Sequence, residues 1–161
     1  MKTVQVNNDF PPGFFEAIGQ LAVAFGRLEY EMKLAVKTLS GKGFSQGMAE
    51  AESYGQFYWR CERTKALAEK ELLAPHLEIF IRLIDEAKVL APERNNNFHA
   101  LWTTKSGKPV RYCPHMDKKT KTLVWLPTSV TIPDLEDLAT TLRNLYNAIR
   151  TAKKAWPTIG K

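Results

Sequence analysis

The sequence contains few of the features that would mark a secreted or membrane protein. Two cysteines among 161 residues cannot form a network of disulfides. The first residues lack the apolar segment of a signal peptide, and no stretch approaches the roughly 20 apolar residues of a membrane helix. Low-complexity segments and internal repeats are also absent. We therefore expect one intracellular, cytoplasmic domain over residues 1–161, without membrane contact.

Motifs for common cofactors and catalytic metals are missing as well. There is no glycine-rich phosphate loop, no Gly-x-Ser-x-Gly and no zincin helix. Cys113 and His115 are two potential metal ligands, but no second pair follows at zinc spacing. We therefore expect no metal and no cofactor.

Hydrophobic periodicity predicts a mainly helical fold. A first helix over 15–39 has apolar residues at three- and four-residue spacing, and Gly19 and Gly26 within it would permit close approach of a neighbouring helix. A second helix is expected over 48–73 and a third over 76–90, each ended by an Ala-Pro pair. A short helical segment over 94–102 follows. The predicted apolar stripe of the first helix comprises Ile18, Leu21, Ala22, Phe25, Leu28, Met32, Ala35, Val36 and Leu39.

The periodicity changes after residue 103. Two β-rich runs, 109–113 and 122–126, predict a small hairpin over about 103–127. Thr131 and Pro133 then open a final helix with acidic residues in its first turn, where they suit the helix dipole. The expected architecture is a bundle of four to five helices with a β-hairpin inserted before the C-terminal helix.

Positive charge is concentrated in two segments. The chain carries a net charge of +6, whereas residues 100–121 and 138–161 each sum to +5. Two basic segments on a mildly acidic body indicate a surface for a polyanion. The alternative is a solvated hairpin tip and a helix end whose charge matches the dipole. The basic residues of the first segment are Lys105, Lys108, Arg111, Lys118, Lys119 and Lys121.

The most informative segment is Arg94-Asn95-Asn96-Asn97-Phe98-His99. Histidine exchanges a proton near neutral pH, and arginine offers a permanently charged planar fork that matches phosphate oxygens. Asparagine can hold a phosphate oxygen or orient the histidine. Together Arg94, Asn95 and His99 suit phosphodiester cleavage without a metal ion. Alternatively, Arg94 is a solvated residue at a helix start and His99 a hydrogen-bonded core histidine.

This segment resembles the active-site motif of HEPN-superfamily ribonucleases, in which an arginine, followed by a polar residue, is separated from a histidine by four to six intervening residues. The long first helix, the later motif and the hairpin before a final helix are also similar to small bacterial members of that superfamily. The resemblance implies a metal-independent endoribonuclease that cleaves RNA by attack of the ribose 2′-oxygen, with Arg94, Asn95 and His99 catalytic. It further implies a homodimer with a composite active site, a role as a toxin or phage-defence effector, and an antitoxin or other regulatory protein as a partner.

The spacing within the motif constrains its geometry. Residues five apart on a regular helix differ by about 140° and do not share a face. Arg94 is therefore expected in a loop or first turn before the helix of His99, unless a second chain completes the site. Glu29 lies within the apolar stripe of the first helix, and a buried carboxylate is costly unless it is paired. We expect Glu29 to face the site and orient Arg94 or His99; otherwise it lies at the edge of the stripe.

Residues outside the motif are also expected to contact RNA. The basic hairpin and the C-terminal turn would hold the RNA backbone. Phe98 and Trp102 could stack on bases, although packing in the core or at a dimer interface is favoured for both. The alternative functions are a non-catalytic dimeric helical module that binds RNA or a protein, and a ligand-binding four-helix bundle.

Overall fold

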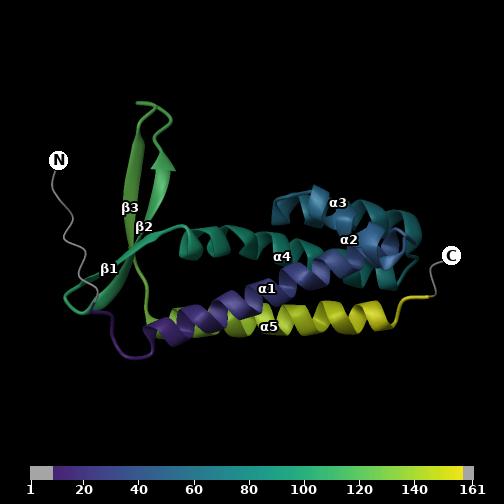
Figure 1. Ribbon diagram of the computed structural model, residues 1–161, viewed down its shortest axis with the longest axis horizontal. Coiled ribbons are helices and arrows are strands. Elements are labelled where there is room, and N and C mark those ends of the chain that lie inside the picture. Colours follow the sequence, from purple (N-terminus) through teal and green to yellow (C-terminus); the bar gives the residue numbers. More distant parts are fainter. Residues whose placement is uncertain (1–8, 158–161) are drawn as a thin grey trace.

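The protein is mainly helical, with a small antiparallel sheet inserted before its last helix (Figure 1). The computed structural model describes residues 9–157. In chain order its elements are α1 (Phe14–Leu39), α2 (Phe44–Ser53), α3 (Phe57–Glu71), α4 (His76–Phe98), β1 (Leu101–Lys105), β2 (Lys108–Met116), β3 (Leu123–Ser129) and α5 (Ile132–Lys154).

Helices α1 and α5 form the long axis of the molecule and run side by side in the same direction (Figure 1). The apolar stripe of α1 is buried as expected, except that Ile18 is half-buried and Ala22 is exposed. Near the C-terminal end of α5, Lys153 Nζ donates to Glu31 Oε1 of α1 at 2.7 Å, and burial lowers the pKa of Lys153. Lys153 is therefore engaged inside the protein and cannot serve as an exposed contact for RNA.

The start of α5 confirms the predicted helix signal. Thr131 Oγ1 accepts from the backbone N–H of Asp134 at 3.2 Å, and the Asp134 carboxylate accepts from the N–H of Thr131 at 2.8 Å. This reciprocal capping box satisfies donors that have no partner within the helix. It fixes where the chain leaves the sheet and enters the bundle.

The predicted second helix over 48–73 is wrong, because the chain divides there into α2 and α3. The break lies at Gly55, whose φ of +60° is a conformation that glycine adopts without steric cost. Buried Arg60 secures the break by donating to the carbonyl oxygens of Ala51 and Gly55, each at 3.1 Å. The loop over 54–56 consequently lies beside the C-terminal part of α4.

The expected break at Ala91-Pro92 is also wrong. Helix α4 continues through Pro92 to Phe98, although a proline inside a helix removes one backbone hydrogen bond and costs about 3 kcal/mol. Burial of Phe80, Ile84 and Ala87 on the preceding turns holds this helix in the core. The motif from Arg94 therefore begins in the last turns of a long helix and not at a helix start.

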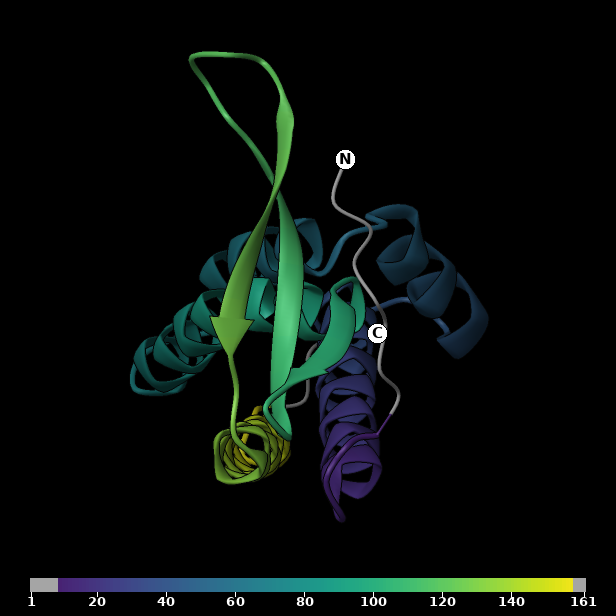
Figure 2. The same ribbon diagram turned by 90° about the vertical axis from the view of Figure 1, so that its left-hand side faces the viewer.

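The sheet is a three-stranded meander in the order β1-β2-β3, with one strand more than the predicted hairpin. Ser106 and Gly107, both with positive φ, form the two-residue turn between β1 and β2. Trp102 pairs with Arg111, and Arg111 pairs with Thr128. The distal part of β2 and β3 projects away from the helices as a two-stranded ribbon (Figure 2).

The close approach expected at the glycines of α1 occurs elsewhere. A Cβ at Gly19 or Gly26 would meet no atom within 4 Å, whereas one at Gly47 would lie 2.9 Å from Lys37 Cα. The tight contact therefore joins α1 to α2 through Gly47. Among the described residues, no helix is long and apolar enough to cross a membrane.

Candidate functional site

The motif lies in a cleft of about 770 Å³ formed by α1, the loop between α2 and α3, and the C-terminal end of α4. Arg94, Asn95, His99 and Glu29, the four residues predicted to be catalytic, all line it. The fold thus brings Glu29 and Arg94, which are 65 residues apart in sequence, to the same cleft.

Arg94 is held in place by two neighbours. Its guanidinium lies 5.6 Å from the centre of the Phe25 ring, and its Nη1 donates to Asn95 Oδ1 at 3.1 Å. Both contacts leave most of the five guanidinium N–H donors available. Phe25 is itself buried, so this cation–π contact fixes the arginine against a rigid surface.

His99 occupies the position immediately after the last residue of α4. Its backbone N–H donates to the Asn95 carbonyl oxygen at 3.0 Å, and its φ of −109° departs from the helix. The side chain is exposed. Although residues five apart on a helix point about 140° apart, Arg94 and His99 both line the cleft.

Glu29 faces the cleft, and its side chain is 28% exposed. Within residues 9–157 its charged partner is Arg60, with Nη1 at 3.9 Å from Glu29 Oε1. Since Arg60 is almost fully buried, this pair places a carboxylate at the cleft floor with a fixed counter-charge behind it. Orientation of Arg94 or His99 by Glu29 remains a prediction.

Sequence reasoning missed Lys88 and Tyr58, which also line the cleft. Lys88 Nζ donates to Glu62, which raises the pKa of Lys88, and lies 5.0 Å from the centre of the Tyr58 ring. A continuous helix would have revealed Lys88, because residues 88, 92, 95 and 99 then lie on one face. Tyr58 comes from another helix, and no local signal indicates it.

The end of α4 is fastened to the sheet by Arg111. Its Nη1 and Nη2 each lie 3.1 Å from Glu93 Oε2, and Nη1 also donates to Asn97 Oδ1 at 2.9 Å. Buried Asn97 accepts from Trp102 Nε1 at 2.8 Å through its carbonyl oxygen. Arg111 is therefore engaged within the protein and anchors the cleft.

Phe98 and Trp102 pack against the core, which supports packing over base stacking for both. The Trp102 ring meets the Phe14 ring edge to face, with centroids 5.1 Å apart. These contacts hold β1 against the start of α1.

The lysines predicted to bind RNA are exposed but fall into two separate groups. Lys105 and Lys108 flank the turn between β1 and β2, whereas Lys118, Lys119 and Lys121 lie at the far tip of the ribbon. Nine residues of β2 separate the groups by about 30 Å, given a rise of about 3.3 Å per residue. The two groups therefore cannot contact the same phosphate.

Cys113 and His115 do not form part of a larger ligand set. Cys113 Sγ donates to the Asn96 carbonyl oxygen at 3.4 Å. In the described part of the chain, no three His, Cys, Asp or Glu side chains lie together as a metal site would require. Comparisons with protein-family models, curated proteins and solved structures found no match to this chain.

Proposed function

We propose that the chain is a HEPN-type endoribonuclease that cleaves RNA without a metal ion. The observation that carries the proposal is the convergence of Arg94, Asn95 and His99 in one open cleft, with the Glu29 carboxylate in the same cleft. This set combines a phosphate-binding cation, a neutral positioning group and a proton-transfer group.

The reaction would be an internal transesterification. The ribose 2′-oxygen attacks the adjacent phosphorus, a bond between that oxygen and phosphorus forms, and the bond from phosphorus to the 5′-oxygen breaks. His99 would remove the 2′-hydroxyl proton or protonate the leaving 5′-oxygen. Arg94 would stabilise the charge on the phosphorane, with Asn95 holding the guanidinium in place. The products carry a 2′,3′-cyclic phosphate and a 5′-hydroxyl.

One histidine can perform only one of the two proton transfers at a time. A homodimer that joins two clefts would supply the second histidine, which agrees with the exposure of His99. The exposed lysines at the two ends of the sheet would bind the RNA backbone outside the reacting phosphate.

A second candidate function is a non-catalytic module that binds RNA or a protein partner through the same surface. The specific observation in its favour is an exposed aromatic pair at the cleft edge. Tyr58 and Trp59 meet edge to face with centroids 5.1 Å apart, and they are 45% and 58% exposed. Exposed aromatic residues of this kind are enriched in interfaces.

The test is incubation of the purified protein with labelled single-stranded and structured RNA in EDTA, beside Arg94→Ala and His99→Ala. Arg82→Ala and His76→Ala are matched controls, because both residues lie on α4 and neither lines the cleft. The nuclease proposal predicts cleavage by the native protein and both controls, with loss in both cleft variants. RNA binding without cleavage by any of the folded proteins would favour the non-catalytic module.

A further inference from the structure

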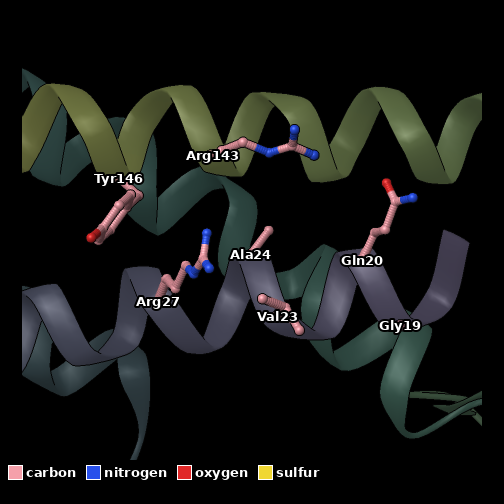
Figure 3. Close-up of a pocket in the computed structure, with 7 residues that line it drawn as sticks. All are labelled: Gly19, Gln20, Val23, Ala24, Arg27, Arg143 and Tyr146. Carbon is pink, nitrogen blue, oxygen red and sulfur yellow. The ribbon is translucent and has the colours of Figure 1, made fainter. Parts of the chain in front are cut away.

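A second concave site lies on the opposite side of α1 from the cleft. It is a groove of about 380 Å³ between α1 and α5 (Figure 3). Val23 and Arg27 line the groove, whereas Phe25 and Glu29 line the cleft. Residues two apart on a helix point about 200° apart, so the two sites are separated by the body of α1.

Two arginines extend over this groove without an acidic partner. Arg27 projects from α1 toward α5, and the guanidinium of Arg143 lies along the facing edge of α5 (Figure 3). Among residues 9–157, neither guanidinium forms a hydrogen bond or an ion pair. Arg63 and Arg111, by contrast, each pair with a carboxylate. Two unpaired guanidinium groups beside one groove suit a phosphate monoester, because the phosphate oxygens can accept hydrogen bonds from both groups.

Other polar groups around the groove are already occupied. Gln20 Nε2 donates to Glu16 Oε1 at 3.4 Å, and Tyr146 Oη accepts from Arg150 Nη1 at 3.4 Å. Arg150 and Glu16 do not line the groove, but each contacts a residue that does. The two arginines that line the groove are therefore left to recognise the ligand's charge.

The rest of the groove is apolar and open. Val23 is 56% exposed, Ala24 and the Tyr146 ring lie beside it, and Gly19 has no neighbour within 4 Å of the position of a Cβ. A volume of about 380 Å³ lies near the lower end of the range for small-molecule sites. The shape suits a phosphate joined to a compact apolar or aromatic group.

We propose that the α1–α5 groove binds a small organic phosphate of the size of a nucleoside monophosphate. The phosphate lies between Arg27 and Arg143, and the organic group covers Val23 toward Gly19. This site does not depend on the proposed nuclease activity, because none of its residues lines the cleft.

The test is calorimetric titration of the full chain with AMP, adenosine and inorganic phosphate at physiological ionic strength. AMP is expected to bind the native protein more tightly than either fragment. Arg27→Gln and Arg143→Gln should each weaken AMP binding about tenfold or more, since each removes a charge-assisted contact. Because both side chains are exposed and without polar partners, the variants should fold normally, as measured by circular dichroism.

Gly19→Leu provides a steric test. The new side chain has space, and leucine favours a helix more than glycine does, so the fold should be retained. It should block AMP and leave the binding of inorganic phosphate unchanged. Arg94→Ala should bind AMP normally, which distinguishes the groove from the cleft. Equal AMP affinity in the native protein and in an Arg27→Gln/Arg143→Gln double variant would overturn the proposal, as would inorganic phosphate or adenosine binding as tightly as AMP.

Discussion

Arg60 is the residue whose replacement should reveal most about how the cleft is built. Only 2% of it is exposed, yet it carries a full charge in the interior of the bundle. It donates to the carbonyl oxygens of Ala51 and Gly55 and lies 3.9 Å from Glu29 and 3.7 Å from Glu52. It thereby joins α2, the loop over 54–56 and the carboxylate at the cleft floor.

We predict that Arg60→Met lowers the free energy of unfolding by about 3 kcal/mol. Each hydrogen bond from a charged donor contributes about 1.5 to 3 kcal/mol, and the variant loses two of them. The two ion pairs add little, because Glu29 is partly and Glu52 largely exposed. Methionine fills much of the same volume, which limits the cost of a cavity.

Chemical denaturation measures this loss directly, and for a chain of this size it corresponds to a decrease in Tm of about 6 to 12 °C. Arg82→Met is the matched control, because Arg82 is exposed, and it should change stability by no more than about 0.5 kcal/mol. Hydrogen exchange at the backbone amides of 54–58 should accelerate in Arg60→Met. A loss below about 1 kcal/mol, or exchange that is unchanged there, would refute the assigned role of Arg60.

Three other predictions test separate parts of the structure. Burial raises the pKa of Cys61 to about 12 from an ordinary 9.0, so the unfolded chain loses the thiol proton first as pH rises. Relative to Cys61→Ala, the free energy of unfolding from denaturation curves should therefore fall by at most about 4 kcal/mol between pH 9 and 12. An identical pH dependence of the two proteins would contradict this. Thr131→Ala removes the bond to the Asp134 N–H and should cost about 1 kcal/mol in thermal unfolding, whereas no loss would show that the capping box is unimportant. Gly47→Ala places a Cβ 2.9 Å from Lys37 Cα and should destabilise the protein by about 1 to 3 kcal/mol in urea; a more stable variant would refute the close contact.

The helices that could be predicted are those whose signals are local. The apolar stripe of α1 and the Thr131 cap of α5 lie within the elements that they define, and both predictions are confirmed. The break at Gly55 was missed because it depends on hydrogen bonds from Arg60 to two backbone carbonyls. Continuation of α4 through Pro92 was missed because tertiary packing outweighs the local cost of a proline.

In the candidate site, too, the residues with local sequence signals could be predicted and those placed by long-range packing could not. Arg94, Asn95 and His99 could be selected because they are adjacent in sequence, and Glu29 because a carboxylate within an apolar stripe is unusual. Lys88 was hidden by the wrong helix boundary at Pro92. Tyr58, Arg60 and the pair of Arg27 with Arg143 could not be predicted, since long-range packing brings each of them to its site.

Transesterification at the cleft is tested by cleavage of an RNA in EDTA, compared with the same RNA carrying a single 2′-deoxyribose at the cleavage position. We expect cleavage of the all-ribose strand to a 2′,3′-cyclic phosphate and a 5′-hydroxyl, identified by mass spectrometry. The deoxy-substituted strand should stay intact, and His99→Ala should cleave neither strand. Cleavage of the substituted strand at that position, or unreduced activity of His99→Ala, would contradict transesterification at this cleft.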